Sequence, residues 1–72
     1  MPNKAEELAE RVERENEEFA KAKQVHTELA KRVDELESKA FLTPQDELEL
    51  KNLKKKKLAS KDLMERILLQ YR

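Results

Sequence analysis

The sequence predicts an all-α protein, an antiparallel two-helix hairpin that resembles a coiled coil and has arms of unequal length. The 72 residues include no glycine and only two prolines, so few tight turns are expected. Charged residues make up 44 % of the chain, and Ala, Glu, Lys, Leu and Arg dominate, as is typical of long helices and coiled coils. Apolar residues also recur in steps of three and four through both halves.

The first helix is predicted to run from about residue 4 to about residue 39. Glu15 and His26 are the polar exceptions in its apolar stripe, and no proline or glycine interrupts it. The sequence therefore predicts one unbroken helix here. The apolar members of the stripe are Leu8, Val12, Phe19, Ala22, Leu29, Val33, Leu36 and Ala40.

The turn is predicted over about residues 40–43, and the second helix over about residues 44–70. Thr43 is a favourable N-cap, and Pro44 follows at the first helical position, where its missing N–H costs nothing. Asp46 lies three residues after Thr43, like the acidic member of a capping box. So short a connection predicts that the second helix returns along the first.

The apolar stripe of the second helix fits this reversal. It contains Leu50, Leu53, Met64, Ile67 and Tyr71, with Lys57 and Ser60 as polar exceptions. A turn centred near Thr43 pairs Phe19 with Ile67, His26 with Ser60, and Glu15 with Tyr71.

The unequal arms predict self-association. The first arm is longer, so Leu8 and Val12 are expected to lack a partner within the chain, and a hairpin of this size has a thin core. A second apolar surface is expected from Val25, Leu48, Leu58, Leu63 and Leu69. We expect a homo-oligomer, by default a dimer, or docking to a partner helix. A tetramer and an exchange of arms between chains remain open. The expected packing residues are Leu8, Val12, Phe19, His26, Leu29, Val33, Leu36, Leu50, Leu53, Met64 and Ile67.

The segment 51–61 contains six lysines and no acidic residue, which allows two interpretations. Consecutive lysines on a helix point in four directions, and long lysine stems can cover neighbouring leucines. A solvated flank is therefore favoured, also because no aromatic residue in the segment could stack on a base. The alternative is contact with a nucleic acid or another polyanion through Lys51, Lys54, Lys55, Lys57 and Lys61.

The distribution of charge also favours packing of like chains. Residues 1–40 carry eight Lys or Arg and eleven Asp or Glu, giving −3, and residues 41–72 carry eight and five, giving +3. Halves of opposite charge favour contact with each other, or with copies of each other.

No residue set predicts catalysis. His26 is the only histidine, and its place in the first stripe predicts a buried polar residue that sets the register. No metal-ligand spacing and no nucleophile–base pair occurs, so we expect a non-enzymatic protein without a cofactor. The N-terminus is acidic, no apolar run approaches the ~20 residues of a membrane span, and cysteine is absent, so a cytoplasmic location is expected.

Two motifs resemble those of a known family. Phe19, His26, Leu29, Val33 and Glu37 form the first, and "LKKKKLASKD" at residues 53–62 forms the second. Together they resemble the YdcH-like family of small bacterial proteins of unknown function over about residues 15–70. The resemblance implies a short cytoplasmic helical hairpin that tends to oligomerise, and it implies no activity or cofactor. The positions that match its motif are Phe19, His26, Leu53, Lys54, Lys55, Lys57, Leu58, Lys61 and Asp62.

Overall fold

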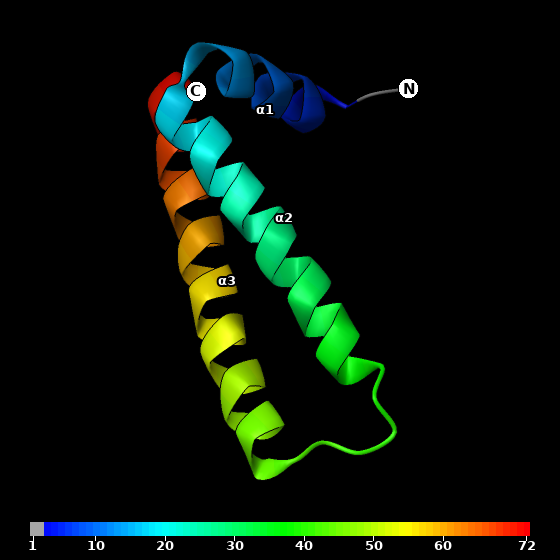
Figure 1. The fold of residues 1–72 in the computed structure, drawn as a ribbon. Coiled ribbons are helices and arrows are strands. Elements are labelled where there is room, and N and C mark those ends of the chain that lie inside the picture. Colours follow the sequence, from blue (N-terminus) through cyan, green and yellow to red (C-terminus); the bar gives the residue numbers. More distant parts are fainter. Residues whose placement is uncertain (1–2) are drawn as a thin grey trace.

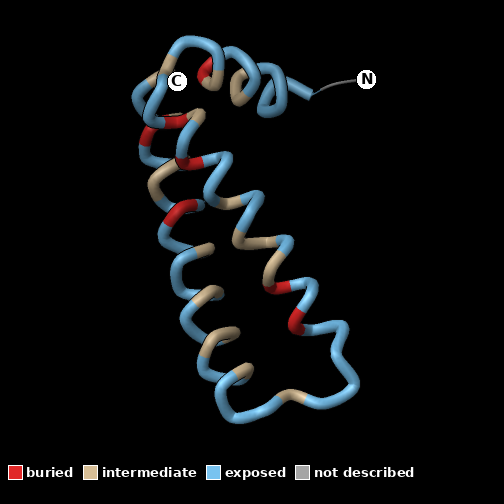
Figure 2. The backbone as a smooth tube through the Cα atoms, in the orientation of Figure 1, coloured by how far each residue is buried: buried red, intermediate tan, exposed pale blue. Residues whose placement is uncertain are grey.

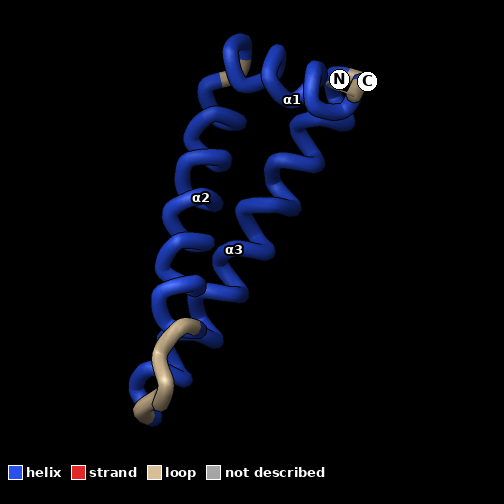
Figure 3. Tube along the Cα trace, turned by 90° about the vertical axis from the view of Figure 1, so that its right-hand side faces the viewer, coloured by secondary structure: helices blue, strands red, loops and turns tan. Residues whose placement is uncertain are grey.

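The computed structural model describes residues 3–72 and contains three helices (Figure 1). They are α1 (Lys4–Glu15), α2 (Glu17–Glu37) and α3 (Pro44–Tyr71), and these residues form no strand. The predicted all-α class is confirmed, but the prediction of two helices is wrong. Helices α2 and α3 lie side by side, and α1 crosses the end of this pair that is distant from the 38–43 turn (Figures 1 and 3).

The predicted helix over 4–39 is interrupted at Asn16. This residue has an extended backbone, with φ −127° and ψ 111°. Its side-chain oxygen accepts a hydrogen bond from the Phe19 N–H at 2.9 Å, so it caps the start of α2. Its own N–H donates to the Val12 carbonyl at 2.7 Å, which closes the last turn of α1. Asparagine is among the best N-cap residues because its side chain replaces the hydrogen bond that a helix start lacks.

The break at Asn16 folds α1 back onto the ends of α2 and α3. Val12, Phe19 and Ile67 form a buried cluster there, with exposed fractions of 0 %, 1 % and 4 %. The prediction that Leu8 and Val12 lack a partner within the chain is therefore wrong. The half-buried residues that pack against this cluster are Leu8, Ala9, Leu63, Met64, Leu68 and Tyr71.

The chain reverses over residues 38–43, where a capping box starts α3. The Asp46 N–H donates to the Thr43 hydroxyl at 3.0 Å, and the Thr43 N–H donates to the Asp46 carboxylate at 3.1 Å. Pro44 occupies the start of the helix. The turn begins two residues earlier than predicted, and the start of α3 is where the sequence placed it. No residue in 3–72 has a positive φ, so this turn does not require the conformational freedom of glycine.

Burial is greatest where all three helices meet and weaker along the rest of α2 and α3 (Figure 2). A second buried group, Val33 and Leu36, lies near the turn on α2. Ala22 and Ser60 are buried as well, whereas Leu29, Leu50 and Leu53 have intermediate exposure. The molecule therefore buries apolar side chains toward both ends and leaves Phe41 and Leu48 exposed near the turn.

Candidate functional site

A shallow hollow on the flank between α2 and α3 brings together polar residues from both sequence motifs. We call it the histidine–lysine hollow, and its lining residues are His26, Lys54, Lys57, Leu58 and Lys61, around a volume of about 160 Å³. His26 comes from α2, whereas the other four come from successive turns of α3. Residues three and four apart on a helix share a face, so Lys54, Lys57 and Lys61 form one row. All five lining residues belong to the motif positions that the resemblance singled out.

The hollow carries more positive than negative charge. The Lys54 ammonium group pairs with the Glu37 carboxylate of α2 at 3.3 Å. Over the described range 3–72, neither Lys57 nor Lys61 lies within ion-pairing distance of a carboxylate. Lys57 is also half-buried, so its charge is partly removed from water. This combination suits the binding of an anionic group.

The structure separates the lysines that the sequence had grouped together. Lys51 and Lys55 are exposed and line neither the histidine–lysine hollow nor the groove described next. Lys56 lies on the other flank of α3 and lines that groove. The lysine run thus divides between different faces, as its helical spacing requires.

A second depression lies near the 38–43 turn. We call it the turn-end groove; its volume is about 430 Å³, and it is lined by Gln45, Leu48, Glu49, Asn52, Leu53 and Lys56. Leu48 is 60 % exposed there, and Phe41 in the turn is 88 % exposed. Leu58, Leu69 and Val25 are also exposed, whereas Leu63 packs against the buried cluster.

The expected packing residues divide between the core and its edges. Five are buried: Val12, Phe19, Val33, Leu36 and Ile67. Six are half-buried: Leu8, His26, Leu29, Leu50, Leu53 and Met64. Most of this set therefore serves contacts within the chain, and the apolar residues with the greatest exposure lie elsewhere.

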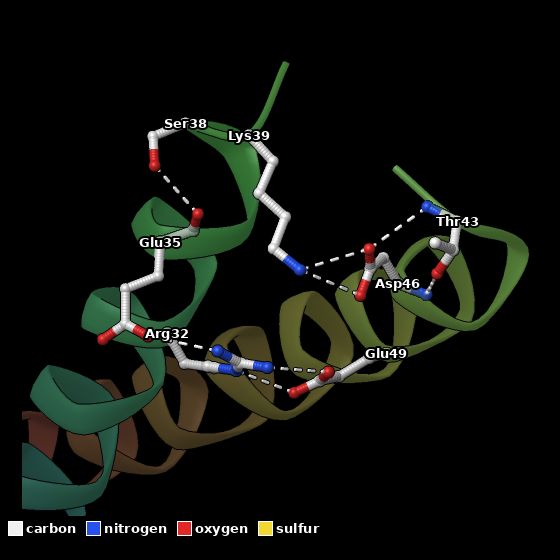
Figure 4. A network of polar contacts seen from close by, with 7 residues as sticks. All are labelled: Arg32, Glu35, Ser38, Lys39, Thr43, Asp46 and Glu49. Atoms are coloured by element: carbon white, nitrogen blue, oxygen red, sulfur yellow. Dashed lines mark hydrogen bonds and ion pairs between the residues drawn. The ribbon is translucent and has the colours of Figure 1, made fainter. Parts of the chain in front are cut away.

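An ion-pair network fixes the turn end of the molecule (Figure 4). The Arg32 guanidinium makes two hydrogen bonds to the Glu49 carboxylate, at 2.8 and 3.1 Å, and one to Glu35 at 3.1 Å. Lys39 pairs with Asp46 at 3.2 Å. The hydrogen bonds from Arg32 lower the pKa of Glu49, and the backbone N–H of Thr43 lowers the pKa of Asp46, with a smaller effect from Lys39.

These lowered pKa values predict weakening of the fold in acid. A carboxylate whose pKa is lower in the folded state contributes stability above its unfolded pKa, about 4, and that stability is lost as the pH falls through the folded value. Glu49→Gln should therefore reduce the thermal midpoint at pH 7, and the difference from the parent chain should disappear in strong acid. Glu65→Gln is the control, since Glu65 makes no ion pair in the described residues. Thermal melts of both variants across the acid range check this, and equal shifts would contradict it.

Two predicted polar contacts differ in the structure. The Ser60 hydroxyl donates to the Lys57 carbonyl of its own helix at 2.8 Å, so it does not serve His26 as a donor. The Tyr71 hydroxyl lies 3.5 Å from the Asn16 side-chain nitrogen, whereas Glu15 pairs with Arg11. The break at Asn16 moves the contact with Tyr71 by one residue. The sequence did contain a signal for this break, since asparagine followed by Glu17 and Glu18 is typical of a helix start.

The described residues contain neither a candidate metal cluster nor a helix suited to a membrane. No group of three or more His, Asp or Glu side chains in 3–72 could hold a metal ion. None of the helices over this range combines the length and the apolar character that crossing a bilayer requires.

Comparison with known proteins connects the histidine–lysine hollow to a family. The family model DUF465, described as "Protein of unknown function", matches residues 19–68. The match begins at Phe19 and extends through most of α3, so it includes every residue of the hollow and leaves α1 outside. No curated protein and no solved structure matches the chain. The chain belongs to the DUF465 family, which is the YdcH-like family that its two motifs resemble.

Proposed function

We propose that this protein is a non-enzymatic, cytoplasmic helical-hairpin module that associates with copies of itself, with α2 and α3 as an antiparallel, coiled-coil-like pair. One observation carries the proposal: Phe41, at 88 % exposure, lies in the turn next to the α3 segment that forms the turn-end groove. An aromatic side chain left in water beside a partly apolar depression is typical of an interface.

Exposed apolar side chains at the turn end would provide the free energy for association. Helix α1 covers the buried cluster at one end, although Leu69 stays exposed there. At the turn end Phe41 and Leu48 remain exposed. Fully burying such a side chain contributes about 1.5–3 kcal/mol, which is large for a domain below ~70–80 residues, whose core alone contributes about 3–5 kcal/mol. Association at the turn end would bury these two side chains and so stabilise the folded chain.

The geometry favours a twofold contact. Phe41 lies in the turn over 38–43, and the groove is lined by residues between 45 and 56 at the start of α3. A projecting side chain and a receiving groove at the same end allow two copies to exchange the same contact, each Phe41 entering the partner's groove near Leu48 and Leu53. Such an interface is self-complementary and closes at two subunits. A dimer is therefore the expected state.

Sedimentation velocity over micromolar to millimolar concentrations tests this. The parent chain should sediment as a dimer at the upper concentrations, and Phe41→Ser should raise the dissociation constant by about tenfold or more. Leu69→Gln is the control, because Leu69 is also a large exposed apolar residue but lies at the other end of α3. A parent chain that stays monomeric at millimolar concentration would refute self-association. Equal effects of the two variants on the dissociation constant would contradict an interface at the turn end.

A further inference from the structure

The histidine–lysine hollow has no role in the association proposed above. Its five lining residues are all different from those of the turn-end groove. Within the described residues it contains two lysines without an ion-pair partner, Lys57 and Lys61. Like charges one helical turn apart repel each other, so a bound anion would relieve a cost that the folded chain carries.

The geometry points to the sugar-phosphate backbone of a nucleic acid as the ligand of this hollow. Lys54, Lys57 and Lys61 span about 10 Å along α3, at 1.5 Å per residue. A compact anion would meet only part of this row, whereas a chain of phosphates can follow it.

The remaining lining residues define the kind of contact. The Leu58 side chain and the lysine stems provide apolar surface, and the His26 ring forms the wall on α2. An imidazole N–H can donate to a phosphate oxygen. The hollow contains no Phe, Tyr or Trp on which bases could stack, and no arginine for paired hydrogen bonds to guanine. Binding should therefore depend on phosphate contacts, with strong salt dependence and little preference for sequence.

The test measures fluorescence anisotropy of a labelled single-stranded oligonucleotide of mixed sequence, titrated with the full chain at several salt concentrations. Each phosphate contact to a single strand contributes about −0.7 to the slope of log affinity against log salt. Three contacts predict a slope of about −2, and K57Q/K61Q should reduce its magnitude by about 1.4. The same double variant should weaken binding at least tenfold in low salt. His26→Phe, which keeps a ring but loses its N–H, should weaken binding severalfold.

A matched control separates the hollow from net charge. K31Q/K55Q removes the same two charges from exposed lysines outside the hollow, and its affinity should stay within twofold of the parent. Circular dichroism of each variant checks that the helices are intact, and Lys61→Gln alone, at an exposed position, repeats the test without altering half-buried Lys57.

Three results would overturn the proposal. One is an absence of binding at low salt, and another is an equal loss of affinity in the two double variants. The third is equally tight binding of polyglutamate, which would assign the hollow to acidic protein segments.

Discussion

Replacing Phe19 by alanine should lower the free energy of unfolding by about 3–5 kcal/mol, enough to unfold much of the population of so small a domain. Phe19 is 1 % exposed and lies in the cluster with Val12 and Ile67. Its ring therefore joins α2 to both α1 and α3. Removing the ring leaves a cavity that the surrounding helices can fill only in part. Urea unfolding followed by circular dichroism at low protein concentration measures the loss.

Phe41→Ala is the matched control for this prediction. The same atoms are removed from a side chain that is 88 % exposed, so the isolated chain should lose less than about 0.5 kcal/mol. The comparison requires dilute protein, because association at the turn end would add a concentration-dependent contribution to stability. Similar losses in the two variants would contradict the position of the core.

Replacing Val12 by alanine should lower the free energy of unfolding by about 2 kcal/mol. Val12 is 0 % exposed because α1 folds back over Phe19 and Ile67. An unbroken first helix would instead leave Val12 in water, where alanine would be neutral or slightly stabilising through its higher helix propensity. The sign of the change therefore distinguishes the folded-back arrangement from an extended arm.

Val25→Ala supplies the control within the same molecule. Val25 is helical and 47 % exposed, so its truncation should cost well under half of the Val12 effect. Urea unfolding of both variants at one concentration gives the comparison. A larger loss at Val25 than at Val12 would contradict the structure.

Local signals in the sequence were sufficient for the class of fold and for the start of α3. Thr43, Pro44 and Asp46 act through contacts of three residues or fewer, so their capping role could be predicted without knowledge of the fold. The contact of Phe19 with Ile67 also followed, because a short turn fixes the register of the two stripes. The break at Asn16 did not follow, because the apolar period continues through it. The cap that Asn16 provides and the burial of Val12 together stabilise the break more than an unbroken helix through Asn16 would.

The candidate site could be predicted only in part. Helical spacing is enough to put Lys54, Lys57 and Lys61 on one side of α3, but it does not show which side faces α2. That depends on how the two helices are rotated about their axes, which the packing of Val33, Leu36 and the half-buried leucines determines. Predicting that His26 lines the same hollow would also have required knowledge of this rotation. The exposure of Phe41 was also missed, because turn residues outside both stripes carry no periodic signal.

Each chain closes its own core by folding α1 back at Asn16. Nuclear Overhauser contacts in a sample of mixed labelled and unlabelled chains test it most directly, because isotope filtering separates contacts within a chain from contacts between chains. We expect Val12 to contact the Phe19 ring and Ile67 within one chain, together with a break in the helical contacts at Asn16. Unbroken helical contacts through Asn16, or contacts from Val12 to Ile67 only between chains, would contradict the account.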